Sequence, residues 1–162
     1  MTHPFDTLQL DNGAQIIFTP CPGTKNTSIN AALTQLKVAG TSMLVTLLET
    51  QEIKRLGVEA LEAECDQLNI KWLQLPIEDD AAPEQEFEQR WSLYKTDILN
   101  VLANGGTIAV HCKGGTGRTG LVVGLILLAL GWDSDKVIPQ VQKIRPKAFS
   151  KVAQLQYFQA KV

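Results

Sequence analysis

Ten consecutive residues, His111 to Gly120, hold the side chains best suited to chemistry; they read His-Cys-Lys-Gly-Gly-Thr-Gly-Arg-Thr-Gly. Five residues separate Cys112 from Arg118, and three of them are glycine. Apolar runs precede and follow the segment, at Thr107–Val110 and Leu121–Leu130, which predicts a loop between a strand and a helix. Glycines let backbone N–H groups point at one centre, and the helix directs its positive end there. The loop is therefore predicted to bind an anion.

Cys112 is predicted to be a nucleophile rather than a buried packing residue. The loop N–H groups, the helix dipole and the Arg118 guanidinium all favour a thiolate there, and a thiolate is nucleophilic at neutral pH. Arg118 stands in a first helical turn, where the dipole disfavours a cation, so an anion is expected beside it. Its planar fork matches two phosphate oxygens, which lysine does not. Further phosphate contacts are expected from Lys113, Gly114, Gly115, Thr116 and Gly117.

Supporting residues are predicted around this loop. The Thr119 hydroxyl is expected either to point at the cysteine sulfur or to serve as an ordinary helix threonine. His111 is expected to hydrogen-bond nearby backbone and hold the loop rather than to transfer protons. The Lys113 side chain faces either the pocket mouth or solvent. Cys21 and Cys65 are expected to be packing residues. The alternative is a protective disulfide with the nucleophile, for which Cys21 is preferred to Cys65.

Cleavage of a phosphate ester also requires an acid that protonates the leaving oxygen. The acidic loop, Glu78–Pro83, follows a predicted strand and supplies two candidates, Asp79 and Asp80, with Glu78 beside them. A solvated acidic turn without a catalytic role is the alternative. The residue types alone do not choose between the two aspartates.

Short apolar strands alternate with amphipathic helices along the chain. Strands are expected at 15–18, 43–48, 70–77 and 107–110, and helices at 28–38, 49–56, 58–68, 84–104, 117–130, 134–144 and 150–161. This alternation predicts one α/β domain over residues 1–162, with a mostly parallel central sheet of about four to five strands and helices on both faces. Because ligands bind at the carboxyl ends of such strands, the glycine loop, the acidic loop and Pro20–Gly23 are expected on one rim.

Composition excludes several classes of function. The 162 residues carry a net charge of −2, so neither nucleic acid nor an anionic membrane is an expected partner. The longest apolar run is too short to span a bilayer, and the first residues do not resemble a secretory signal. Three cysteines without a spaced framework favour a reducing compartment. A cytoplasmic location is therefore expected.

The segment from His111 to Thr119 resembles the signature of the cysteine-dependent dual-specificity and tyrosine protein phosphatase family. The order of the parts is similar as well, with Leu75–Asp79, a helix, a strand, the signature loop and a helix. Ile144–Pro146 resembles the segment that closes the pocket in this family. Leu47–Glu49, Leu75–Asp79 and the paired loop glycines most resemble the kinase-associated phosphatase (cyclin-dependent kinase inhibitor 3) subgroup. The resemblance runs from about residue 15 to about residue 158.

This resemblance implies a two-step mechanism without a metal ion or other cofactor. Cys112 would attack phosphorus while Arg118 and the loop N–H groups hold the equatorial oxygens. Asp79, preferred to Asp80 on the resemblance alone, would protonate the leaving oxygen. Water would then hydrolyse the phosphocysteine, with Asp79 taking a proton back. The implied substrate is a phosphoprotein of unknown identity, carrying phosphotyrosine, phosphoserine or phosphothreonine.

The sequence departs from the family pattern in two places. The acidic loop has no Trp-Pro before the aspartate, unlike the large tyrosine-specific enzymes, which argues against a large swinging lid. Near the C-terminus, many relatives have Gln-Thr four residues before another Gln, whereas this chain has Ser150-Lys151 followed by Gln154. Ser150 and Gln154 are the candidates for positioning water, and hydrolysis of the intermediate is expected to be slow.

Three other functions fit parts of the pattern. A phosphatase for phosphoinositides or other small phosphate esters is suggested by Lys113, but Thr116 stands where such enzymes usually carry a second lysine. A rhodanese-type sulfurtransferase also uses a cysteine on a strand-to-helix loop, but the arginine, threonine and acidic loop argue against it. A catalytically inactive phosphoprotein-binding module would usually lack the cysteine, the arginine or the acid, and this chain has all three.

Overall fold

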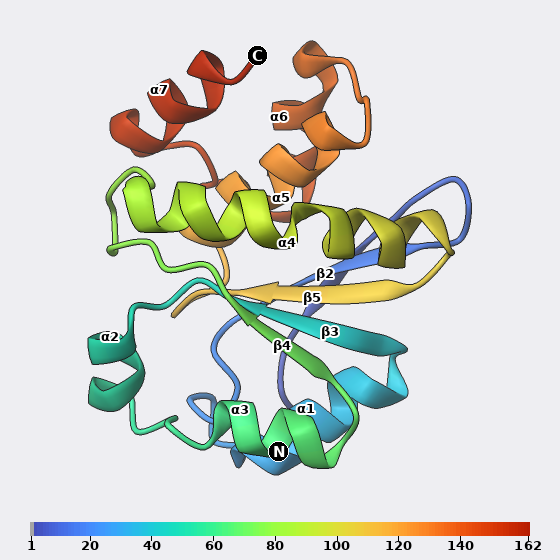
Figure 1. The fold of residues 1–162 in the computed structure, drawn as a ribbon, viewed down its shortest axis with the longest axis vertical. Coiled ribbons are helices and arrows are strands. Elements are labelled where there is room, and N and C mark those ends of the chain that lie inside the picture. Colours follow the sequence, from blue (N-terminus) through green and yellow to red (C-terminus); the bar gives the residue numbers. More distant parts are fainter. Residues whose placement is uncertain (1) are drawn as a thin grey trace.

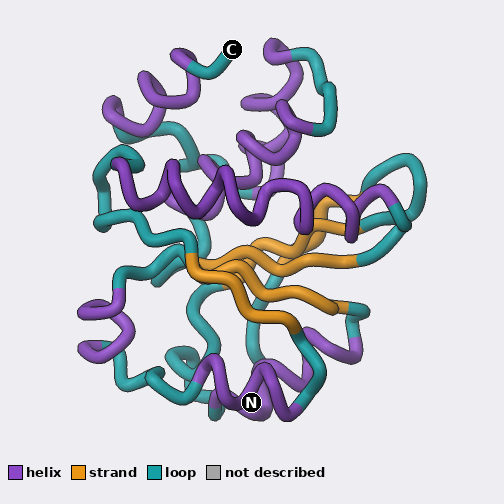
Figure 2. Tube along the Cα trace, in the orientation of Figure 1, coloured by secondary structure: helices purple, strands orange, loops and turns teal. Residues whose placement is uncertain are grey.

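The computed structural model describes residues 2–162 and shows a five-stranded sheet between two layers of helices (Figures 1 and 2). The strands are β1 (Asp6–Gln9), β2 (Gln15–Thr19), β3 (Thr41–Thr46), β4 (Lys71–Gln74) and β5 (Thr107–His111). The helices are α1 (Ile29–Val38), α2 (Thr50–Arg55), α3 (Leu61–Gln67), α4 (Gln85–Ala103), α5 (Gly117–Ala129), α6 (Ser134–Ile144) and α7 (Val152–Ala160). The predicted α/β architecture is confirmed.

The strand order is β1-β2-β5-β3-β4, and only the edge pair β1–β2 is antiparallel. The middle strand, β5, is buried along its whole length because sheet neighbours flank it and helices cover both faces. Its last residue, His111, lies in register with Thr19 of β2 and Thr46 of β3. The carboxyl ends of the three central strands therefore meet at one rim.

Helices α1, α2 and α3 cover one face of the sheet, and α4 to α7 lie on the other (Figure 1). The interior helix of the second layer is α5, whose residues from Arg118 to Leu127 are all buried. A Cβ atom at Gly120 would lie 2.6 Å from the Ala148 Cβ atom, so the segment after α6 packs directly on the first turns of α5. This contact brings the 145–150 segment to the N-terminal end of α5, beside the glycine-rich loop.

Several predicted boundaries were wrong. The strand β1 was not predicted, because its sequence Asp-Thr-Leu-Gln has one apolar residue and only Leu8 is buried. The strands expected at 43–48 and 70–77 lie at Thr41–Thr46 and Lys71–Gln74. Backbone pairing continues past the second of them, with Leu75 N–H 2.8 Å from Thr46 O, but Pro76 has no N–H to extend a regular ladder.

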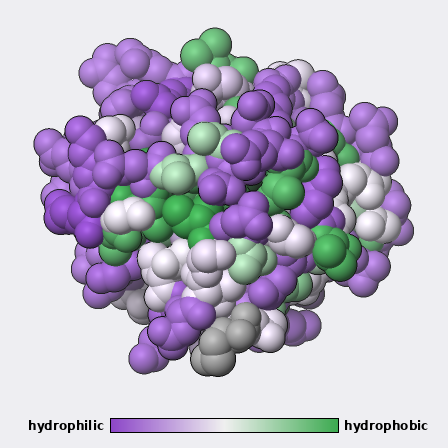
Figure 3. Space-filling view, turned by 90° about the horizontal axis from the view of Figure 1, so that it is seen from below, coloured by the Kyte–Doolittle hydropathy of each residue, from purple (hydrophilic) through white to green (hydrophobic). Residues whose placement is uncertain are grey.

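Two helices begin later than predicted. Helix α3 starts at Leu61 because Val58–Ala60 forms a turn, and α7 starts at Val152 because Phe149 adopts a left-handed φ of 64° just before it. Within residues 2–162 no helix is both long and apolar enough to cross a membrane. The face seen from below in Figure 3 is mainly hydrophilic, with hydrophobic side chains between polar ones.

Candidate active site

The glycine-rich loop Cys112–Arg118, here called the phosphate loop, connects β5 to α5. Backbone hydrogen bonds attach the first residues of this loop to the segments that follow β2 and β3. The Cys21 N–H after β2 donates to Lys113 O at 3.0 Å, and the Leu47 N–H after β3 donates to His111 O at 3.0 Å. Gly115 has a φ of +80°, and a Cβ atom there would lie 2.6 Å from the carbonyl carbon of Thr19. Glycine is therefore required where the loop touches the end of β2.

Two donors point at the sulfur of Cys112. The Gly115 N–H and the Thr119 hydroxyl each lie 3.2 Å from Sγ, and Cys112 is buried. The structure thus places the Thr119 hydroxyl on the sulfur, which was one of the two predicted orientations. Donors in these positions stabilise negative charge on sulfur, both before it attacks and when it later leaves.

A buried carboxylate that the sequence did not single out holds Arg118. Glu52, on α2, accepts a bidentate pair of hydrogen bonds, from Nη1 at 2.7 Å and Nη2 at 3.0 Å. The Ile77 carbonyl accepts a third, at 3.0 Å from Nη1. Burial opposes the charge, but the hydrogen bonds and charge of Glu52 outweigh it and raise the pKa of Arg118. The cation at this helix start is thus explained in part by a carboxylate within the protein.

One edge of the Arg118 guanidinium is only partly paired. Its Nε is buried and has no hydrogen-bond partner among the described residues. Nη2, on the same edge, lies 3.2 Å from Asp79 Oδ1. An unpartnered buried N–H on a cation costs free energy, so this edge is suited to an anion that enters the pocket. Nε and Nη2 together form the fork that a phosphate accepts in bidentate fashion.

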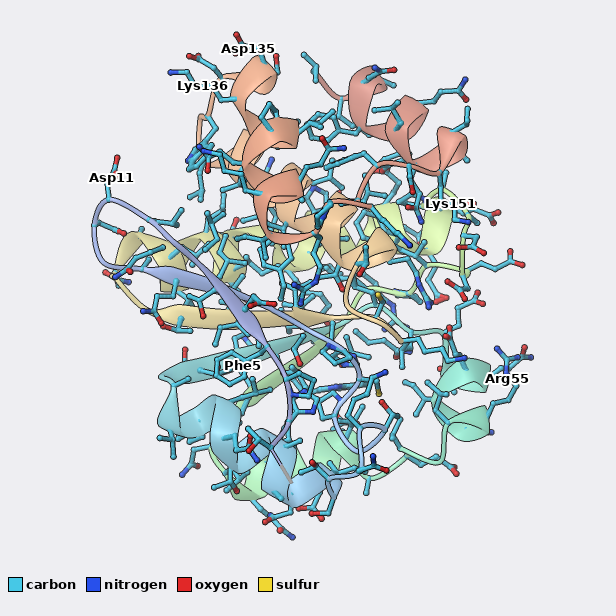
Figure 4. All side chains as sticks on the ribbon, turned by 180° about the vertical axis from the view of Figure 1, so that it is seen from behind. Phe5, Asp11, Arg55, Asp135, Lys136 and Lys151 are labelled. Atoms are coloured by element: carbon cyan, nitrogen blue, oxygen red, sulfur yellow. The ribbon has the colours of Figure 1, made fainter. Side chains whose placement is uncertain are left out.

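The acidic loop separates its two aspartates. Asp79 contacts Arg118, and its side chain is 59% exposed. Asp80 adopts a left-handed φ of 62° and points its carboxylate toward Lys151, with Oδ1 3.7 Å from Nζ. Figure 4 shows Lys151 on the same side of the molecule as Arg55 of α2. Asp79 is therefore the aspartate placed against the phosphate-binding arginine.

His111 is part of a buried hydrogen-bond chain beneath the loop. Its Nδ1 lies 2.9 Å from the Cys112 carbonyl, which can only accept, so Nδ1 carries the proton. Its Nε2 accepts a hydrogen bond from the Thr46 hydroxyl at 2.7 Å, and that hydroxyl accepts from Trp72 Nε1 at 2.8 Å. Burial lowers the pKa of His111 to about 4, so the ring is neutral and holds the loop. This agrees with the predicted structural role.

A pocket of about 320 Å³ opens above the phosphate loop. Gln154 lies in its wall, 1% exposed, with Nε2 donating to Ala81 O at 3.2 Å and Oε1 buried without a partner in the described chain. Lys147 was not predicted as a site residue, because only packing of the 145–150 segment brings it here. The lining residues are Asp79, Asp80, Cys112, Lys113, Gly114, Thr116, Gly117, Arg118, Lys147, Ser150, Lys151 and Gln154.

The remaining cysteines are buried and free. Burial, reinforced by the nearby Cys112, raises the pKa of Cys21 to about 12, and burial raises that of Cys65 to about 12. Both thiols are therefore protonated at neutral pH, as expected for packing residues. Among residues 2–162 no cluster of three or more histidine, cysteine, aspartate or glutamate side chains is arranged to hold a metal ion.

Solved structures share this fold over nearly the whole chain. The kinase associated phosphatase with its catalytic-site cysteine replaced by serine has a TM-score of 0.85 at 20% identity, covering 98% of this chain and 93% of that chain. Tk-PTP in its active form has a TM-score of 0.69 at 21% identity, covering 90% of this chain and 89% of that chain. At these identities the likeness establishes the fold.

Sequence relatives are similar over part of the chain. Tyrosine-protein phosphatase CDC14 of Candida albicans is 35% identical over 98 residues, which are 59% of this chain and 18% of that protein. Protein tyrosine phosphatase type IVA 2 of Mus musculus is 30% identical over 111 residues, a match that covers 62% of this chain and 65% of that protein. The chain thus spans less than two thirds of either relative.

A match to a sequence family covers the acidic loop, the phosphate loop, and the helix α4 and strand β5 between them. Residues 21–132, well over half of the chain, match Tc-R-P, described as "Polymorphic toxin system, DSP-PTPase phosphatase". The matched range contains Cys112, Arg118, Asp79 and Glu52. The chain therefore belongs to this dual-specificity and tyrosine phosphatase family.

Proposed function

We propose that this chain hydrolyses phosphate monoesters on proteins through a phosphocysteine intermediate. The observation that carries the proposal is the buried Nε of Arg118, which has no partner in the described chain, on a residue that lines the pocket above Cys112. A phosphate bound there would satisfy the arginine edge and lie over the sulfur. The geometry therefore joins an anion site to a nucleophile.

In the first step, the Cys112 sulfur attacks phosphorus and an S–P bond forms as the ester P–O bond breaks. Arg118 and the N–H groups of the phosphate loop hold the equatorial oxygens, where negative charge is concentrated. Asp79, at the pocket mouth beside Arg118, gives its proton to the leaving oxygen. The substrate hydroxyl leaves, and the phosphoryl group stays on sulfur.

In the second step, water attacks the phosphocysteine and the sulfur leaves as a thiolate. Gln154 positions this water through its Oε1, which is buried in the pocket wall and has no other partner in the described chain. Asp79 accepts the proton that the water loses. The Gly115 N–H and the Thr119 hydroxyl, each 3.2 Å from Sγ, stabilise the departing thiolate. Ser150 lines the pocket but is the weaker candidate for holding water, because it is exposed.

The proposed substrates are phosphotyrosine, phosphoserine or phosphothreonine in proteins. The printed names of the relatives support this, since they are tyrosine phosphatases. We place the activity in the cytoplasm, because a nucleophilic thiol and two further free cysteines suit a reducing compartment. No nucleic-acid or membrane partner is proposed for a chain with a net charge of −2.

A phosphoinositide headgroup is the second candidate substrate. Three lysines, Lys113, Lys147 and Lys151, line the pocket and suit a ligand with more than one anionic group. PTPMT1, which has been solved in complex with PI(5)P, has the same fold with a TM-score of 0.68 at 19% identity. A second lysine of the phosphate loop is absent at Thr116, and protein substrates are therefore preferred.

Phosphate release separates these candidates. The purified chain and its Cys112→Ser variant would be compared on p-nitrophenyl phosphate, phosphotyrosine and phosphothreonine peptides, and a soluble phosphoinositide. We expect turnover of the peptides by the wild type and none by the variant. Turnover of the lipid headgroup alone would establish the second candidate. Turnover of thiosulfate and cyanide to thiocyanate, with no phosphate release, would contradict both.

A further inference from the structure

Arg145, at the C-terminal end of α6, is bonded to the outside of the phosphate loop. Its Nε donates to the Gly115 carbonyl at 2.8 Å, and its Nη2 donates to the Phe18 carbonyl at 3.2 Å. The guanidinium carbon also lies 5.7 Å from the centre of the Phe18 ring. The side chain is 15% exposed, so little water competes for these contacts. One guanidinium therefore connects the loop to the end of β2.

The contact with Gly115 decides where another loop group points. In a trans peptide the C=O of one residue and the N–H of the next point in opposite directions, and residues 2–162 contain no cis peptide. Arg145 holds the Gly115 carbonyl from outside, so the Thr116 N–H must point the opposite way. Thr116 lines the pocket over Cys112. We infer that Arg145 is a positioning residue that directs the Thr116 N–H at the bound phosphate.

Asp6 holds the third side of the same guanidinium. Arg145 Nη1 lies 2.6 Å from Asp6 Oδ2, on the edge strand β1. The carboxylate is 62% exposed, so it contributes less than the buried carbonyl contacts. The edge strand, α6 and the phosphate loop are thereby joined through one side chain. Tungstate affinity and kcat/KM should therefore fall strongly on loss of Arg145 and only slightly on loss of Asp6.

The test measures oxyanion binding as well as turnover, because the inference rests on the proposed function. Arg145→Met, Arg145→Lys and Asp6→Asn would be compared with the wild type and with Lys143→Met. The control removes an exposed cation of the same helix for which no ion pair is found in the described chain. Tungstate affinity by calorimetry, kcat and KM on p-nitrophenyl phosphate, and thermal unfolding would be measured for each.

We expect Arg145→Met to weaken tungstate binding and to lower kcat/KM, each by about 100-fold, as for loss of one aimed donor. Arg145→Lys should recover only part of the lost tungstate affinity and kcat/KM, because a point charge does not hold two carbonyls. Asp6→Asn should change the tungstate affinity and kcat/KM by about threefold or less. Tungstate affinity and kcat/KM at wild-type levels in Arg145→Met, or full recovery by lysine, would overturn the inference.

Two further outcomes keep the proposals separate. If the wild type binds tungstate but releases no phosphate from any ester, the proposed function fails while the tungstate series still decides the role of Arg145. If Arg145→Met does not fold, the tungstate affinity of Arg145→Lys decides the role of Arg145 instead. A folded lysine variant with reduced tungstate affinity supports positioning, and wild-type affinity in that variant overturns it.

Discussion

The two loops that face each other across the pocket are built in different ways. The phosphate loop is contiguous in sequence and buried at its two reactive residues, and both adjacent strands and Arg145 bond to it. The acidic loop carries an exposed Asp79, and its neighbour Asp80 has a left-handed φ of 62°. Under the proposed function, phosphoryl binding therefore depends on a buried loop with several backbone contacts, and proton transfer depends on an exposed carboxylate.

This contrast has a kinetic consequence. Changes to the phosphate loop or its supports should impair every ester to a similar degree, since all esters present the same phosphoryl group. Changes to the acidic loop should depend on the leaving group, because a good leaving group departs without a proton. Leaving-group dependence therefore assigns a residue to one side of the pocket or the other.

After loss of the nucleophile itself, the largest effect is expected for Arg118→Lys. Lysine keeps the charge but loses the fork that binds two oxygens and Glu52 at once. We expect kcat/KM to fall by about 1,000-fold, and equally for p-nitrophenyl phosphate and phenyl phosphate. Steady-state kinetics on the two esters checks this. A loss confined to phenyl phosphate would place Arg118 with the acidic loop and contradict the assignment.

Asp79→Asn should show the opposite pattern. Without the acid, kcat/KM for phenyl phosphate is expected to fall by about 100-fold, and for p-nitrophenyl phosphate by less than about tenfold. The matched control is Asp80→Asn, whose side chain faces Lys151 instead. If the control shows the leaving-group dependence and Asp79→Asn does not, the acid is Asp80.

Glu52→Gln tests whether Glu52 of α2 supports the phosphate loop, in which case its loss affects both esters equally. The amide keeps the shape but loses the charge that pairs with buried Arg118. We expect kcat/KM to fall about tenfold on both esters, and the free energy of unfolding to fall by about 2 kcal/mol. The exposed Glu49→Gln serves as the control on the turn that begins the same helix. Wild-type kinetics in Glu52→Gln would show that Arg118 holds its position without the pair.

The last prediction concerns stability rather than catalysis, namely the pH dependence caused by the buried His111. Burial lowers its pKa from 6.5 to about 4 in the folded chain, so the unfolded chain binds the extra proton first. Stability should therefore be full above about pH 6.5 and fall as the pH drops toward 4, by at most about 3 kcal/mol. Urea unfolding at pH 7 and pH 4.5 measures the change. An equal loss in His111→Gln would show that other groups cause it.

The same contrast governs how much the sequence could predict. The phosphate loop was recognisable because its nucleophile, glycines and arginine are consecutive, and the alternation of apolar strands and helices predicted the sheet that presents it. Glu52 reaches the site only through packing of α2, so its position in the sequence carries no signal. Arg145 lies in Ile144–Pro146, whose family resemblance indicated the pocket but not the contact with the Gly115 carbonyl. The choice between Asp79 and Asp80 depends on one left-handed residue, which the composition of the loop does not reveal.

The central claim is that Cys112 carries the phosphoryl group between the two steps. The direct test is acid quenching of the purified chain during turnover of a radiolabelled phosphopeptide, followed by peptide mapping. The account predicts label on the peptide that contains Cys112, lost on chase with unlabelled substrate and absent from Cys112→Ser. Rapid turnover with no label on that peptide, or turnover by Cys112→Ser, would contradict it.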